Sequence, residues 1–134
     1  MKPETIKRNY CNLVQYLSGS EIAKYSNLLG ASPKTINESA EFLGRIGVDY
    51  HKQPLLFSTT VKKKKAKLRV FFKEVLGEAV GECALEERAR TFFQEYASSG
   101  NYNAVLMRSS AYHRNNKDKL RAKYEHQGDG LCQS

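Results

Sequence analysis

Residues 25–43 read YSNLLGASPKTINESAEFL, and this stretch decides the expected fold of the first half of the chain. Ser32 followed by Pro33 predicts a helix start, because serine caps free backbone amides and proline suits the first helical position. Ile36 and Ala40 then lie one helical turn apart, on the inner side of a helix that we expect to reach about residue 46.

A second helix is expected just before this one. Ser18 and Glu21 are spaced as in a capping box, which predicts a helix start there and an end near residue 29. Gly30 suits the left-handed backbone that ends a helix, and Ser26 is small enough for two helices to cross at its position. Apolar residues at steps of three and four between residues 5 and 17 predict a first helix.

This pattern resembles the helix-turn-helix of bacterial DNA-binding regulators over about twenty residues. The resemblance implies a tri-helical core whose third helix lies in the major groove of double-stranded DNA. Its outward residues would then contact bases and phosphates: Ser32, Lys34, Thr35, Asn37, Glu38, Glu41 and Arg45. Asn37 could read adenine, and Glu38 could accept from cytosine. The two glutamates outweigh Lys34, so phosphate neutralisation must come from elsewhere.

Residues 47–60 change from a helical period to short runs rich in valine, tyrosine, phenylalanine and threonine around a proline. This change predicts either the β-hairpin wing of winged-helix domains or an ordinary loop with one strand. In a winged helix the wing tip touches the DNA backbone or minor groove. His51, Lys52 and Gln53 are therefore further contact candidates.

The densest charge run of the chain follows, with Lys62, Lys63, Lys64, Lys65, Lys67 and Arg69. Residues 61–80 hold seven Lys or Arg against two Asp or Glu, which is the largest excess in a chain of net charge +8. We interpret the run as an electrostatic anchor for phosphates. A solvated helix start and a nuclear-import signal are the alternatives.

Helical stripes dominate the rest of the chain. One stripe runs from Leu68 to Val80 and another from Ala84 to Tyr96, and each can pack within the chain or against a second copy. We expect a mainly α protein with a helix-turn-helix domain over 1–61, a helical extension over 62–126 and a flexible tail over 127–134. Because small helix-turn-helix proteins read paired half-sites, we expect a homodimer.

Composition and motifs narrow the function classes. No apolar run is long enough to span a membrane, and the N-terminus lacks the pattern of a signal peptide. Cys11, Cys83 and Cys132 show no metal-ligand spacing and are expected to be free, the first two in the core. No nucleotide-binding or hydrolase motif occurs. We therefore expect neither an enzyme nor a metal or other cofactor.

The sequence thus favours sequence-specific binding of double-stranded DNA by a small transcriptional regulator. The location would be the cytoplasm, on the nucleoid, in a prokaryote, or the nucleus if the source is eukaryotic or viral. Two alternatives stay open. One is a helical adaptor that docks a protein partner through the aromatic stripes with Phe71, Phe72, Phe92 and Phe93. The other is a basic RNA-binding protein.

Overall fold

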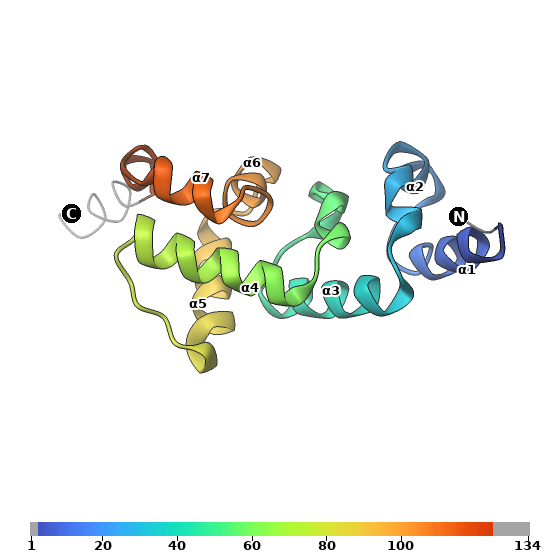
Figure 1. Ribbon diagram of the computed structural model, residues 1–134, viewed down its shortest axis with the longest axis horizontal. Helices are drawn as coiled ribbons and strands as arrows, with labels where there is room; N and C mark the ends of the chain where they lie inside the picture. Colours follow the sequence, from blue (N-terminus) through green and yellow to red (C-terminus); the bar gives the residue numbers. More distant parts are fainter. Residues whose placement is uncertain (1–2, 125–134) are drawn as a thin grey trace.

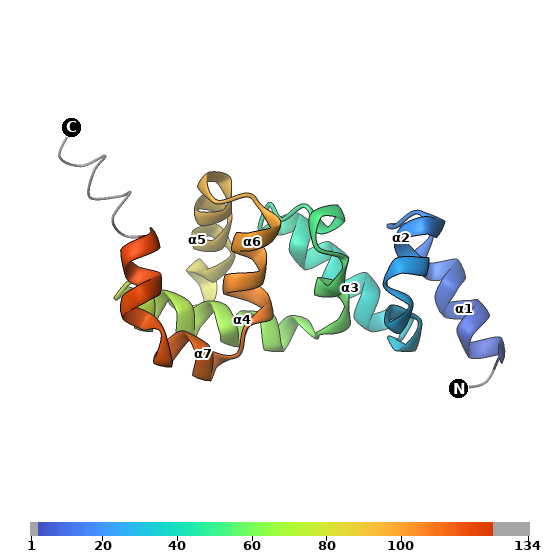
Figure 2. The ribbon, with the colours of Figure 1, turned by 90° about the horizontal axis from the view of Figure 1, so that it is seen from above.

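The computed structural model describes residues 3–124, and none of these residues lies in a β-strand. The helices form an elongated molecule with α1 and α2 at one end and α4 to α7 at the other, joined by α3 (Figures 1 and 2). The expected mainly α class is confirmed, whereas the predicted hairpin wing is wrong. The predicted tail over 127–134 lies outside the described residues.

The first three helices bury a small N-terminal core. The helix α1 spans Pro3–Leu13, α2 spans Gly19–Lys24 and α3 spans Pro33–Arg45. Both predicted caps are present: Ser18 and Glu21 form the capping box of α2, and the Ser32 hydroxyl accepts from the Thr35 amide of α3. The N-terminal core consists of Leu13, Leu17, Ile22, Leu28, Ile36, Ala40 and Phe57.

Three details of the predicted helix-turn-helix are wrong. The helix α2 ends at Lys24, and the 3₁₀ helix η1 follows over Ser26–Gly30. Ile22 and Leu28 would lie about 120° apart around a continuous α-helix, so this break brings both into one core. Gly30 does not adopt a positive φ, and Ser26 is exposed rather than placed at a helix crossing.

The segment predicted as a wing forms two short 3₁₀ helices instead, η2 over Tyr50–Lys52 and η3 over Pro54–Ser58. The Asp49 carboxylate accepts from the His51 amide and starts η2, while Pro54 opens η3. Leu56 and Phe57 are both fully buried and enter different cores. The short apolar runs that predicted strands therefore belong to one segment that packs between the two cores.

A larger C-terminal core is built by the second half of the chain. The helix α4, Val61–Val70, continues as the π-helical turn η4, Phe71–Val75. The helix α5 spans Glu82–Glu95, α6 spans Ser99–Tyr102, the π-helical turn η5 spans Asn103–Met107 and α7 spans Ser110–Asn115. Residues 117–124 are helical as well, so residues 99–124 form several short helical pieces.

The aromatic residues of both predicted stripes lie inside this core, but the stripes are shorter than predicted, because the helix of the first stripe ends near Val75 and both Ala79 and Ala84 are exposed. Phe71 stacks edge-on against Phe72, Phe92 and Tyr124, with ring centroids 5.3 to 5.7 Å apart. Phe93 is also fully buried. These rings therefore pack within one chain, and the predicted docking face for a protein partner does not exist at these positions.

By contrast, the apolar stripe expected on the first helix is only partly buried. Leu13 and Leu17 are buried, whereas Ile6, Tyr10 and Val14 are the large hydrophobic side chains that stay exposed among the described residues.

Because Phe71 lies at the centre of the aromatic cluster, its truncation should destabilise the protein most. We expect Phe71→Ala to lower the free energy of unfolding by about 3–5 kcal/mol. Ile6→Ala is the matched control on an exposed position and should change it by less than about 0.5 kcal/mol. Urea unfolding followed by circular dichroism measures both. Equal effects of the two substitutions would contradict the assigned core.

Candidate nucleic-acid interface

The outward face of α3 carries most of the predicted base-reading residues. Lys34, Asn37, Glu38 and Glu41 are exposed, while Thr35 is half-buried. The Tyr16 hydroxyl donates to Asn37 Oδ1 at 2.8 Å, so one acceptor position of this amide is already used. Its amide hydrogens remain available to other acceptors.

The cap of α3 and its last turn are engaged within the protein. Ser32 Oγ accepts from the Thr35 amide and donates to Thr35 Oγ1. Arg45 lies 3.2 Å from a carboxylate oxygen of Glu41 and 2.7 Å from one of Glu86 on α5. Arg45 therefore ties α3 to α5, and Lys34 is the remaining basic residue on the outward face of α3.

The three residues predicted for a wing tip contact other parts of the protein. His51 Nδ1 lies 3.2 Å from the Glu21 carboxylate, and Lys52 Nζ donates to the carbonyl oxygen of Ala97 at 3.1 Å. Gln53 Nε2 donates to Asn103 Oδ1. These contacts join residues 51–53 to α2, to the segment after α5 and to η5. The three side chains therefore link the two ends of the molecule instead of projecting into solvent as a wing tip would.

The predicted lysine anchor forms the helix α4, capped by the Thr60 hydroxyl, which accepts from the Lys63 amide. A helix turns by roughly 100° per residue, so neighbouring lysines point in different directions. The run therefore divides into three groups with different surroundings.

Lys64 is fully buried at the boundary between the two cores. Its amino group donates to Ser39 Oγ at 3.2 Å, to Thr59 Oγ1 at 2.9 Å and to the Thr59 carbonyl oxygen. No carboxylate pairs with it among the described residues. Burial, with a smaller contribution from the charge of Lys67, lowers the pKa of Lys64 to about 7. Lys64 therefore holds α3 and α4 together and does not contact a ligand.

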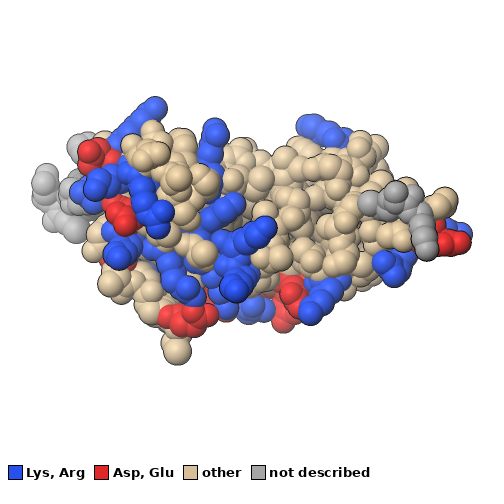
Figure 3. Space-filling view, in the orientation of Figure 1, with Lys and Arg blue, Asp and Glu red and all other residues tan. Residues whose placement is uncertain are grey.

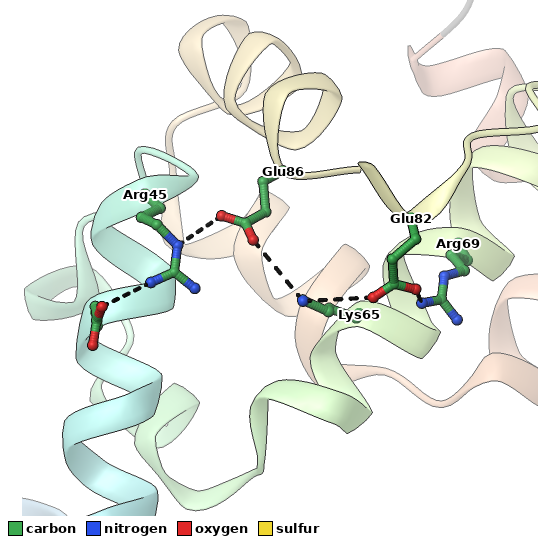
Figure 4. Close-up of polar contacts among 6 residues, drawn as sticks. Arg45, Lys65, Arg69, Glu82 and Glu86 are labelled. Carbon is green, nitrogen blue, oxygen red and sulfur yellow. Dashed lines mark hydrogen bonds and ion pairs between the residues drawn. The ribbon is translucent and has the colours of Figure 1, made fainter. Parts of the chain in front are cut away.

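Lys65 and Arg69 face the N-terminal end of α5. Lys65 Nζ lies 3.7 Å from Glu82 and 3.9 Å from Glu86, and Arg69 forms an ion pair with Glu82. Together with Arg45 these side chains make a chain of alternating charges that links α3, α4 and α5 (Figure 4).

The third group belongs to a larger basic surface that we name the α4–α7 surface. Helices α4 and α7 lie against each other, and Figure 3 shows Lys and Arg gathered over their half of the molecule. None of its members pairs with a carboxylate among residues 3–124. We define this surface by seven basic residues: Lys62, Lys63 and Lys67 on α4, Lys73 on η4, Arg114 on α7, and Lys117 and Lys119 in the helical residues that follow α7.

Sequence reasoning missed four members of this surface as contact candidates: Lys73, Arg114, Lys117 and Lys119. The signal was present, since residues 101–134 hold six Lys or Arg against three Asp or Glu. Only the packing of α7 against α4 shows that these charges extend the lysine run into one surface.

The described residues contain no cluster of three or more His, Cys, Asp and Glu that could hold a metal ion. Cys11 and Cys83 are exposed free thiols, so their predicted place in the core is wrong. Both lie on helix faces that point away from either core. Among the described helices, none is long and apolar enough to cross a membrane.

Comparison with known proteins adds no assignment. A scan against protein-family models found no match, and searches of the curated proteins and of the solved structures found none either.

The buried amino group makes stability depend on pH in a defined direction. Between about pH 7 and 10 the unfolded chain keeps a proton on Lys64 that the folded protein has lost. The free energy of unfolding should therefore rise with pH in this window, by up to about 1.4 kcal/mol per pH unit.

Lys64→Met removes this group, so the variant should lack that part of the slope, whereas contributions from Lys67 remain in both proteins. Urea unfolding at pH 7, 8 and 9 gives the comparison. Parallel pH profiles for the wild type and Lys64→Met would show that Lys64 does not titrate in this window.

Proposed function

We propose that this chain binds double-stranded DNA, with the α4–α7 surface holding the phosphate backbone. The observation that carries the proposal is the number of Lys and Arg without a carboxylate partner among the described residues of α4, η4, α7 and the helical residues that follow α7, in the half of the molecule where Figure 3 shows basic side chains gathered. Each Lys or Arg that meets a phosphate releases condensed counterions, which favours binding. Carboxylates offset little of this charge, because Glu74 and Asp118 are the acidic residues within the same segments.

The exposed side chains favour a duplex over a single strand. Proteins that bind single strands usually stack bases on exposed aromatic rings. Among the described residues the one large aromatic side chain that is clearly exposed is Tyr10, on α1 at the other end of the molecule. The α4–α7 surface thus offers charge for a backbone but no exposed ring for an unpaired base.

The same reasoning weakens the adaptor alternative. A docking face built from Phe71, Phe72, Phe92 and Phe93 is excluded, because these rings fill the C-terminal core. Duplex RNA presents the same phosphate charge as DNA, so the charge pattern of this surface does not distinguish DNA binding from duplex RNA binding.

Base reading by α3 is the second part of the proposal. Lys34, Asn37 and Glu38 are exposed in the first turns of a well-capped helix, the position from which helix-turn-helix proteins read bases. The resemblance of residues 25–43 supports a sequence-specific transcriptional regulator, and a homodimer would read two half-sites.

Loss of charge on the α4–α7 surface should weaken binding to every duplex alike. We expect Lys63→Gln and Arg114→Gln each to reduce the slope of log affinity against log salt by about 0.9. Lys7→Gln on α1, far from this surface, is the matched control and should leave the slope unchanged. Fluorescence anisotropy with a labelled duplex between 50 and 200 mM salt measures it, with duplex RNA as competitor. An effect of Lys7→Gln as large as that of Lys63→Gln would contradict the assigned surface.

Substitution on α3 should change sequence preference and leave backbone binding intact. We expect selection from random duplex DNA to recover a shared motif with the wild type, and Asn37→Ala to lose preference at one base position. The discrimination lost there should be about 1–3 kcal/mol, with an unchanged salt slope. Recovery of unrelated sequences with the wild type would refute base reading by α3 and leave a non-specific DNA-binding protein.

A further inference from the structure

A pocket of about 490 Å³ lies between the outward face of α4 and the start of α5. Its walls combine three cations with one carboxylate and two small apolar side chains: Val61, Lys62, Lys65, Ala66, Arg69 and Glu82. Figure 4 shows Lys65 and Arg69 pointing from α4 toward the carboxylate of Glu82. The pocket is therefore lined mainly by positive charge, and Glu82 is the one acidic side chain in its wall.

The pocket continues the α4–α7 surface around α4. At roughly 100° per residue, Lys62 lies between Lys65 and Arg69 on one flank of the helix and Lys63 and Lys67 on the other. Lys62 lines the pocket and forms no ion pair among the described residues. A duplex that lies on the α4–α7 surface would therefore bring backbone phosphates to the mouth of the pocket.

Glu82 is held in a way that allows its displacement. Its side chain is 62% exposed, and Arg69 is 44% exposed. The distance to Lys65 Nζ is 3.7 Å, which is an ion pair without hydrogen-bond contact. Ion pairs between exposed side chains contribute little to stability, so breaking this one costs little.

We propose that this pocket receives one backbone phosphate of the bound duplex and that Glu82 occupies the same cations in the free protein. The inference rests on the proposed DNA binding and adds its regulation by an internal competitor. A phosphodiester carries one negative charge, as the Glu82 carboxylate does, and its oxygens match the guanidinium of Arg69. The exchange leaves the charge within the pocket unchanged and returns the displaced carboxylate to water.

If the Glu82 carboxylate competes with a phosphate for the same cations, removal of its charge should raise the affinity for duplex DNA. We expect Glu82→Gln to raise the affinity for duplex DNA by about threefold or more at 100 mM salt. Glu87→Gln is the matched control, since Glu87 is exposed on the same helix, makes no ion pair among the described residues and loses the same charge. Its effect reports general electrostatics alone.

Arg69→Ala tests the other side of the pocket. We expect it to lower the affinity by about threefold to tenfold and to reduce the salt slope by about 1. In the Arg69→Ala background, Glu82→Gln should give a smaller gain than in the wild type, because the two residues act on one phosphate. Thermal unfolding of each variant checks that the fold is retained.

The outcomes separate the two levels of the proposal. The proposal is supported if Glu82→Gln raises the affinity for duplex DNA more than Glu87→Gln does. The gain from Glu82→Gln must also be smaller in the Arg69→Ala background. Equal effects of the two glutamate substitutions overturn it while DNA binding by the α4–α7 surface stands. Failure of the wild type to bind any duplex in a salt-dependent manner overturns both.

Discussion

The buried amino group of Lys64 is the contact on which the arrangement of the two halves depends. It lies where the N-terminal core ends and the C-terminal core begins, and it bonds Ser39 of α3 and Thr59 before α4. Burial of a basic group without a carboxylate is costly, and three hydrogen bonds offset part of that cost. The Ser39 hydroxyl also donates to the Thr59 carbonyl oxygen at 2.9 Å, so these polar atoms and the Lys64 amino group form one buried network.

Stability and function draw on different parts of this structure. The two cores bury large apolar side chains such as Phe42, Phe57 and Phe71, which supply most of the stabilising free energy. The ion pairs around Glu82 and Glu86 join exposed or half-buried side chains at the surface and add less. The charges of α4 can therefore exchange partners without loss of the fold, which is the property that a phosphate-binding surface needs.

Sequence reasoning succeeded where a local signal sufficed. The cap at Ser32, the inner stripe with Ile36 and the aromatic stripes around Phe71 and Phe92 follow from capping chemistry and helical period. It failed where tertiary contacts decide. Residues 47–60 have the short runs of Val, Tyr, Phe and Thr that are typical of strands, but they pack between two cores. Lys64 is the same residue type as its exposed or half-buried neighbours Lys62, Lys63 and Lys65. Lys64 differs from these lysines because the fold places Ser39 and Thr59 within hydrogen-bond distance of its amino group.

The rigid link between α3 and α4 bears on how α3 could approach DNA. The outward face of α3 carries Glu38 and Glu41 against Lys34, so this helix alone is repelled by phosphates. The buried Lys64 joins α3 to α4, so the basic side chains of α4 keep a fixed position relative to α3. An acidic reading helix is then compatible with DNA binding, because its neighbour supplies the attraction. In the proposed function, the acidic residues of α3 would oppose contacts in wrong positions, and selectivity would come from the helix that contributes least to affinity.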